Sequence, residues 1–175
     1  QGDRIMTNEM KQIEIAKITV NTSAGEVGDE VEKGFTLLEK LTGKQPVRTS
    51  SKDASKTFGL REGLNIGAKV TLRGEEAREL LEKVLPAADN KISAEAFDGN
   101  GNFAFGVGEY IDVPGMDYDA DIGMKGFEVV VNLERPGYRV KKRDHKPTEI
   151  GKDHKVDDED AQEFVEDELG AEVTQ

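Results

Sequence analysis

Apolar side chains at every second position mark the strands that this chain is expected to form. Such alternation is typical of a strand that buries one face against a core, and residues 127–133 show it, as do 13–20 with some slippage. The cluster Asn-Thr-Ser-Ala-Gly at 21–25 is expected to end the first strand in a turn. The sequence Asp-Gly-Asn-Gly-Asn at 98–102 is typical of a hairpin turn. The predicted strands are residues 13–20, 46–49, 66–72, 92–97, 103–107 and 127–133.

Helical spacing of apolar residues predicts three helices. The first starts at Glu26 and ends at Gly43, the second covers 75–85 and is closed by Pro86, and the third is acidic and starts at Asp157. Strands outnumber helices, and several are joined by hairpins. The pattern therefore predicts an α+β fold, in which helices pack on one face of a mainly antiparallel sheet and a long hairpin-like loop lies between 49 and 66.

One domain is the natural count for 175 residues. We expect it to cover residues 1–156, including a basic extension at about 135–156, and to be followed by an acidic C-terminal helix or tail over 157–175. No segment approaches the roughly 18 to 20 apolar residues of a membrane span, so we expect a cytoplasmic protein with no membrane partner. The chain has no cysteine, which excludes disulfides, thiolate metal sites and cysteine nucleophiles.

Positive charge is concentrated in two segments of an acidic chain. The formal net charge is −12, yet residues 44–74 carry seven Lys and Arg against two carboxylates, and residues 135–146 carry six against one. We call these the first and second basic segments. Their local reversal of sign favours contact with a polyanion such as RNA. Nine carboxylates and no Lys or Arg lie in 157–175, and the sequence is compatible with a protein partner, an RNA partner or solvent at that end.

Candidate catalytic and metal-binding patterns are weak. Asp117, Asp119, Asp121 and Glu128 occupy positions 1, 3, 5 and 12 of a calcium loop, but the sixth position, which needs glycine, is Ile122. The two histidines, at 145 and 154, lie in a polar stretch without further ligands. Phosphate-binding loops of the Walker and dinucleotide types are missing. We therefore predict no catalytic residues, no metal and no cofactor, and keep as an alternative a small phosphometabolite-binding enzyme that holds anions in its glycine-rich turns.

Several sequence blocks occur in the order of a known family. They are Asn-Thr-Ser-Ala-Gly-Glu at 21–26, Thr-Gly-Lys-Gln-Pro-Val at 42–47, Phe-Gly-Leu-Arg-Glu-Gly at 58–63, Ile-Gly-Ala-Lys-Val-Thr-Leu-Arg-Gly at 66–74, Phe-Asp-Gly-Asn-Gly-Asn-Phe at 97–103, Phe-Gly-Val at 105–107, Asp-Tyr-Asp at 117–119 and Arg-Pro-Gly-Tyr-Arg-Val at 135–140. Over about residues 8 to 170 the chain resembles the large-subunit ribosomal protein five family, the universal L-five protein, and its archaeal branch in particular.

The resemblance implies a structural constituent of the large ribosomal subunit. Members bind 5S rRNA in the central protuberance, contact P-site tRNA through the loop that corresponds to 50–63, and help to bridge to the small-subunit head. The partners implied are 5S rRNA, 23S-type rRNA, P-site tRNA, a small-subunit head protein and neighbouring large-subunit proteins. Carried over by position, Asn21, Gln45 and Thr71 match residues that contact 5S rRNA.

The basic segments add further candidates to these three residues. For rRNA they are Lys44, Arg48, Arg139, Lys141, Lys142 and Arg143. For the loop that faces tRNA they are Lys52, Lys56, Thr57, Phe58 and Arg61.

Two departures from the family pattern change the expectation. The family turn Asn-x-Gly-x-Gly after the first strand has Ser23 in place of its first glycine. The tRNA-facing loop, which is normally richer in lysine and arginine, contains Ser50, Ser51 and Asp53. We expect a weaker or more salt-tolerant tRNA contact as a result.

Overall fold

A five-stranded antiparallel sheet forms the centre of the protein. The computed structural model describes residues 8–24, 28–52, 54 and 59–174. Within these residues the strand order is β2-β3-β1-β6-β5, and all four neighbouring pairs are antiparallel. The strands are β1 (Glu14–Ser23), β2 (Val47–Ser50), β3 (Asn65–Leu72), β5 (Asn102–Val107) and β6 (Phe127–Glu134). The predicted α+β class with a mainly antiparallel sheet is thus confirmed.

The remaining regular elements are helices and one small parallel sheet. The α-helices are α1 (Asp29–Thr42), α2 (Glu75–Val84), α3 (Arg139–Lys142) and α4 (Asp158–Leu169). The strands β4 (Lys91–Ser93) and β7 (Glu172–Thr174) pair with each other in parallel. Short 3-10 helices cover Glu9–Lys11, Leu85–Ala88, Ala94–Ala96, Tyr110–Asp112 and Lys152–His154.

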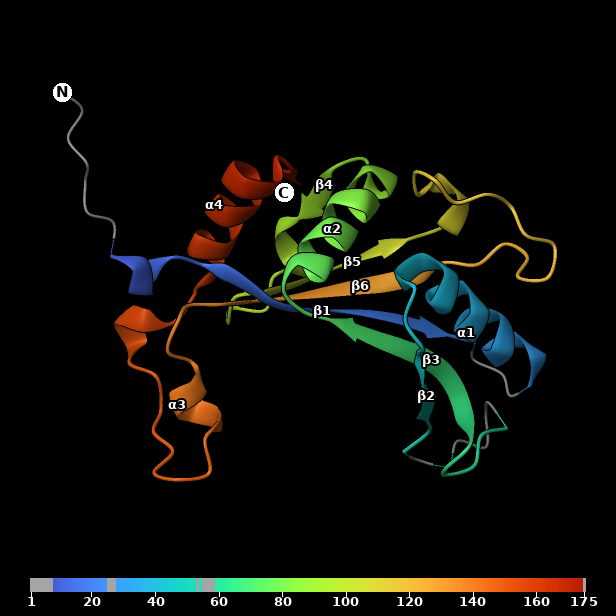
Figure 1. The fold of residues 1–175 in the computed structure, drawn as a ribbon, viewed down its shortest axis with the longest axis horizontal. Helices are drawn as coiled ribbons and strands as arrows, with labels where there is room; N and C mark the ends of the chain where they lie inside the picture. Colours follow the sequence, from blue (N-terminus) through green and yellow to red (C-terminus); the bar gives the residue numbers. More distant parts are fainter. Residues whose placement is uncertain (1–7, 25–27, 53, 55–58, 175) are drawn as a thin grey trace.

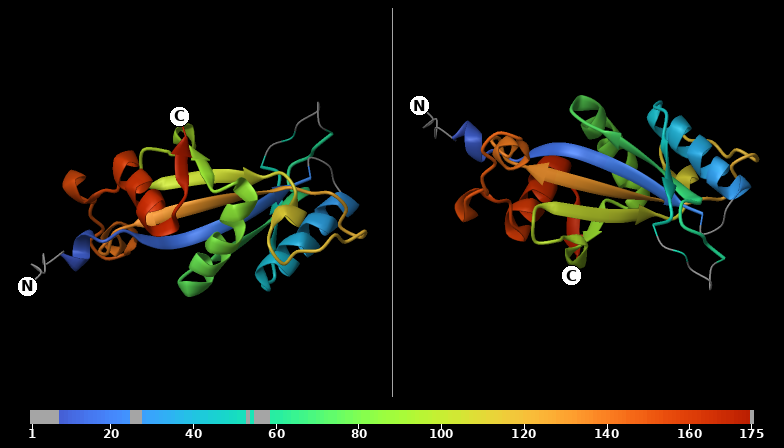
Figure 2. Two further views of the ribbon diagram at one scale, coloured as in Figure 1. Left: turned by 90° about the horizontal axis from the view of Figure 1, so that it is seen from above. Right: turned by 90° about the horizontal axis from the view of Figure 1, so that it is seen from below.

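The three longer helices lie on one side of the sheet (Figure 1). Seen from the other side, β1, β5 and β6 lie in front of α1, α2 and α4, and no helix of the described chain covers their middle (Figure 2). We call this uncovered side of the five-stranded sheet the open face and the other side the helix face. The sheet is therefore buried on one face only, as the alternating sequence predicts.

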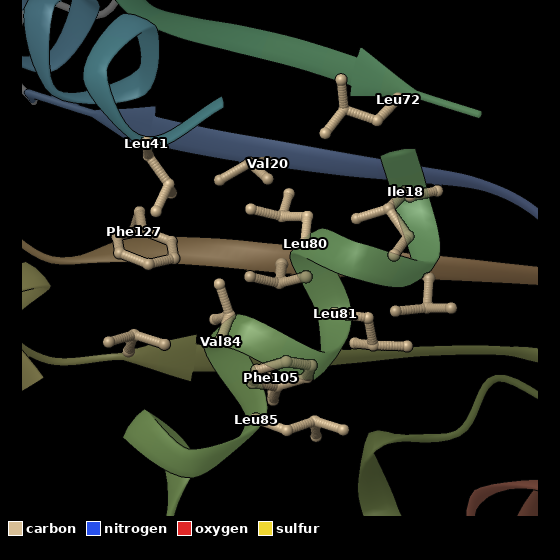
Figure 3. Close-up of a cluster of buried hydrophobic side chains, with 14 of the residues drawn as sticks. Ile18, Val20, Leu41, Leu72, Leu80, Leu81, Val84, Leu85, Phe105 and Phe127 are labelled. Carbon is tan, nitrogen blue, oxygen red and sulfur yellow. The ribbon is translucent and has the colours of Figure 1, made fainter. Parts of the chain in front are cut away.

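The core lies between the sheet and the helix face. Ile18 and Val20 of β1 are fully buried, while Lys17, Thr19 and Asn21, which alternate with them, are half-buried and point to the open face. Helix α2 contributes Leu80, Leu81 and Val84 to this core, and their side chains point toward the strands (Figure 3). Burying such apolar side chains is the main source of favourable folding energy.

Helix α1 packs unusually close to β1. A Cβ atom at Gly34 would lie 2.7 Å from Cγ2 of Thr22, so only glycine allows this approach. Thr22 is the single buried polar residue in the described chain, and its hydroxyl donates to the carbonyl of Gly126 at 3.3 Å. The helix ends, as predicted, at Gly43, which has φ of +66° and donates its N–H to the carbonyl of Glu39.

The acidic C-terminal segment packs against the rest of the protein. Asp157 caps α4 reciprocally with Asp160, which explains why a run of carboxylates starts a helix there. Ala161 and Val165 of α4 are fully buried in the core, and β7 completes a parallel pair with β4. The described part of 157–175 thus forms one body with the sheet, and the predicted acidic helix is confirmed.

Two strand predictions are wrong in their bounds. The first strand continues through the expected turn to Ser23, because β3 pairs with it as far as Ser23 opposite Gly67. The predicted strand at 92–97 is a strand only as far as Ser93, whose hydroxyl accepts from the N–H of Glu95 and starts a 3-10 turn. The predicted hairpin around 98–102 is reduced to a single bridge between Phe97 and Phe103.

Glu30 ties α1 to the segment before β6. Its carboxylate bonds to the ammonium of Lys33 at 2.7 Å and to that of Lys125 at 2.9 Å. The hydrogen bond from Lys33, followed by that from Lys125, lowers the pKa of Glu30 from 4.5 to about 2. Folding is therefore favoured by Glu30 ionisation above pH 4.5, and this contribution is lost as the pH falls toward 2.

The Glu30→Gln variant is expected to lack this acid-sensitive contribution. The urea midpoint of the wild type should exceed that of the variant near neutral pH, and the difference should shrink as the pH falls from 4.5 to about 2. Glu79→Gln, at an exposed α2 position without an ion pair among the described residues, is the control and should show no such trend. A difference between wild type and Glu30→Gln that stays constant over this pH range would contradict the assignment.

Candidate nucleic-acid interface

The open face carries polar side chains because β1 and β3 bury every other residue. Asn21 of β1 lies opposite Lys69 of β3 in the strand register, and Thr19 lies opposite Thr71. The hydroxyls of Thr19 and Thr71 are 3.4 Å apart. Lys17 follows on the same face of β1 and is half-buried. Two neighbouring strands thus present amide, hydroxyl and ammonium groups together.

The open face continues across β6 and β5, where polar residues lie on either side of Val130 and Ala104. Asn132 is the register partner of both Lys17 and Asn102, and its side-chain amide donates to Oδ1 of Asn102 at 2.5 Å. Two carboxylates of β6 share this face: Glu128 lies opposite Asn21, and Glu134, at the other end, lies opposite Glu14. Short amide and hydroxyl side chains can read base edges and ribose hydroxyls, while lysines supply attraction to phosphate.

The two basic segments project on the side of the open face. In Figure 1 the helices α1, α2 and α4 lie above the sheet, whereas β2 and β3 descend below it at one end and α3 with its following loop descends below it at the other. The first basic segment contains β2 and β3, and the second contains α3. The polar sheet surface therefore lies between two positively charged flanks.

Several cations of these segments are paired within the protein. Lys44 bonds to Glu76, Arg135 bonds to Asp160 at 2.8 Å, and Lys142 bonds to Glu134. Because their charge is already matched, these side chains have less attraction left for phosphate.

Arg48 lies on the helix face, away from Asn21 and Thr71. It is the register partner of Ala68, whose side chain points into the core. Its guanidinium forms two hydrogen bonds with Glu32, at 2.9 and 3.1 Å, and lies 4.7 Å from the ring centre of Phe35. The hydrogen bond from Arg48 lowers the pKa of Glu32. The structure thus separates Arg48 from the other predicted rRNA-binding residues.

Other cations have no carboxylate partner among residues 8–24, 28–52, 54 and 59–174. Lys69 is exposed on the open face, and Arg143 bonds only to the carbonyl of Lys146. These cations are the ones best able to contact phosphate. In the two basic segments they are Lys52, Arg61, Lys69, Arg73, Arg139, Lys141, Arg143 and Lys146.

The predicted site residues are brought together in part. Asn21 and Thr71 share the open face, and Gln45 is exposed just before β2. Lys52 and Arg61 are exposed in the connection between β2 and β3. Lys56, Thr57 and Phe58 lie outside the described residues.

Sequence reasoning missed the middle of the surface. Lys17, Thr19, Lys69 and Asn132 complete it, and all four occupy the polar phase of predicted strands. Because alternate residues of a strand point to opposite faces, their position between buried residues could have identified them.

The residues of the calcium-like pattern at 117–128 make structural contacts. Asp119 pairs with Lys40, and the hydrogen bond from Lys40 lowers the pKa of Asp119. Ile122 is buried, and Glu128 points away on β6. In the described part of the chain no three His, Asp or Glu side chains are placed to hold a metal, and no helix is long and apolar enough to cross a membrane.

The helix face has the opposite electrostatic character. A groove of about 880 Å³ lies between the start of β1, the start of α2, and α4. Six carboxylates line it against three cations, so it repels phosphate. They belong to Glu14, Glu75, Asp160, Glu163, Asp167 and Glu168.

Comparisons with known proteins cover nearly the whole chain. Residues 8–61 match the family described as ribosomal protein L5, and residues 65–166 match the model of the C-terminus of the same ribosomal family. The large ribosomal subunit protein uL5 of Nanoarchaeum equitans is 45% identical over 96% of this chain and 99% of its own length. That of Sulfurisphaera tokodaii is 45% identical over 90% of each chain. That of Methanococcus vannielii is 46% identical over 94% of this chain and 92% of its own.

Proposed function

Because the chain belongs to the ribosomal protein L5 family and is thus a structural constituent of the large ribosomal subunit, we propose that it binds 5S rRNA across its open face. The family consists of structural proteins and not of enzymes, which sets aside the phosphometabolite enzyme considered above. Its place of action is accordingly the ribosome.

The distribution of charge and polar side chains between the two faces supports binding of 5S rRNA to the open face. The short polar side chains lie on the open face and the two basic segments project on that same side, whereas the groove on the helix face is lined mainly by carboxylates. Asn21 and Thr71 lie at the centre of this surface and make the specific contacts, while Lys69 beside them supplies attraction. Phosphate contacts position an RNA, and side chains that reach bases and ribose hydroxyls give it specificity.

The flanks are assigned to further RNA partners. The second basic segment contacts the phosphates of 5S rRNA and of the adjoining 23S-type rRNA through Arg139 and Arg143, which lack carboxylate partners in the described chain. The 50–63 loop reaches P-site tRNA with Lys52 and Arg61 and helps to bridge to the small-subunit head, and neighbouring large-subunit proteins border the same region. Ser50 and Ser51 lower the charge of this loop, so its contact with tRNA is light.

Asn21→Ala and Thr71→Ala are each expected to weaken binding of 5S rRNA by about 1 kcal/mol, as for one lost hydrogen bond. The measurement is a gel shift with 5S rRNA and, in parallel, with a nonspecific RNA of equal length. Wild type should prefer 5S rRNA, and both variants should lose part of that preference.

The matched control is Thr36→Ala, which removes a hydroxyl from α1 on the helix face. It should bind 5S rRNA as the wild type does. Undiminished binding by both open-face variants, or an equal loss in the control, would reject the site.

A further inference from the structure

A small pocket lies beside α3, at the end of the sheet from which α3 projects. Its volume is about 190 Å³, below the roughly 300 to 1,000 Å³ of pockets for drug-sized ligands, so it has room for one flat ring and not for a larger molecule. Its apolar walls are Tyr138, Ile150 and Val156. Its polar rim is formed by Asn100, Lys141, Glu149 and Lys155.

The walls of this pocket are held rigidly. The hydroxyl of Tyr138 accepts from the N–H of Val156 at 2.9 Å and donates to the carbonyl of His154 at 3.3 Å. Val156 is fully buried. The turn that carries Asn100 presses on Val156, since a Cβ at Gly101 would lie 2.7 Å from Cβ of Val156. A preformed wall lowers the cost of ordering a ligand.

The rim combines attraction for phosphate with acceptors for a base edge. Lys141 and Lys155 have no carboxylate partner among the described residues. The side-chain amide nitrogen of Asn100 donates to the carbonyl of Asp98 at 3.1 Å, which turns Oδ1 into the available acceptor. Glu149 adds a carboxylate, which accepts hydrogen bonds only and disfavours a phosphate inside the pocket.

We propose that this pocket holds one unpaired nucleobase that carries an exocyclic amino group. The base packs on Tyr138, Ile150 and Val156, its amino group donates to Glu149 and Asn100, and the neighbouring phosphates lie against Lys141 and Lys155. Adenine, cytosine and guanine offer that amino group and uracil does not. The proposal rests on the RNA-binding function above and assigns a base-reading role to the second basic segment, whose Arg139 and Arg143 continue the positive surface.

The test follows the side-chain methyl resonances of Ile150 and Val156 by NMR in the intact protein. The probes are AMP, CMP, GMP, UMP and ribose 5-phosphate, each at millimolar concentration because a single stacked base binds weakly. The first three should shift the Ile150 methyl saturably. UMP should bind roughly 30-fold more weakly, as for two lost hydrogen bonds of about 1 kcal/mol each, and ribose 5-phosphate should leave the methyl unmoved.

The Glu149→Gln variant, at an exposed position, should lose the preference over UMP while its unfolding curve stays that of the wild type. Equal shifts with UMP or with ribose 5-phosphate would reduce the pocket to an anion contact and overturn the proposal. A shift of Ile150 by a Leu-Lys hexapeptide but by no nucleotide would assign the pocket to a protein side chain and overturn it too.

This result is separable from that of the 5S rRNA assay. A silent Ile150 methyl in a protein that still binds 5S rRNA through Asn21 and Thr71 would reject the pocket alone. A methyl that responds to AMP in a protein without preference for 5S rRNA would reject the proposed function and keep the base pocket.

Discussion

Replacing Lys69, Arg139 and Arg143 together with alanine is expected to make 5S rRNA binding much less dependent on salt. Each phosphate contact contributes about 0.7 to 0.9 units to the slope of log K against log salt, so three lost contacts should flatten the slope by about 2 to 3 units. Across a fourfold rise in salt concentration the wild type would then lose roughly 16- to 64-fold more affinity than the variant. These cations were chosen because the described chain offers them no carboxylate partner.

The matched control is the triple alanine variant of Lys44, Arg48 and Lys142. It changes the net charge by the same amount, but each of its cations is already paired with a glutamate. Its slope should flatten by less than about 1 unit. Equal slopes for the two triple variants would show that internal pairing does not decide which cations meet RNA. Affinities would be measured by filter binding at four salt concentrations.

Leu81→Ala is expected to lower the free energy of unfolding by about 2 to 5 kcal/mol. Leu81 is fully buried and points from α2 toward the sheet beneath it (Figure 3). Removing its terminal carbons leaves a cavity that the rigid neighbours on both sides fill only in part. Because the same packing holds the sheet against its helices, the variant should also bind 5S rRNA less well when it is warmed toward its lowered melting temperature.

Urea unfolding followed by circular dichroism measures the loss. Glu79→Ala is the control on the same helix, since Glu79 is exposed and has no ion pair among the described residues. It should change the free energy of unfolding by less than about 0.5 kcal/mol. A loss in Leu81→Ala no larger than in the control would mean that α2 does not bury this side chain.

The pattern of apolar and polar residues within each segment predicts the main helices and strands of the fold. Residues 127–133 alternate because β6 buries Val129 and Val131 and leaves Glu128, Val130 and Asn132 on the open face. Asp157 was recognisable as the start of α4 because carboxylates favour helix N-termini. The pairing of β4 with β7 was not readable. It joins three-residue strands about 80 positions apart, and so short a strand has no periodicity to detect.

The sequence predicts the site residues whose position follows from the alternation of apolar and polar residues along a strand. It does not predict those whose position follows from the register between strands. The polar phase of β1 and β3 gives the open face, including Asn21 and Thr71. The side on which Arg48 lies follows from its pairing with Ala68, and the long connection between β2 and β3 leaves that register open in the sequence. Which cations are neutralised, such as Lys44 by Glu76, depends on contacts between distant elements and required the structure.

Binding of 5S rRNA to the open face is tested most directly by placing one carboxylate on each face of the molecule. Thr71→Glu puts it at the centre of the open face, and Gln162→Glu puts it on α4 of the helix face with the same change in net charge. The measurement is the dissociation constant of each variant for 5S rRNA, after unfolding curves have shown that both are folded. Thr71→Glu should weaken binding by about tenfold or more, through a lost contact and repulsion of phosphate, while Gln162→Glu should bind as the wild type does. Wild-type affinity in Thr71→Glu, or an equal loss in both variants, would contradict the assignment of 5S rRNA to the open face.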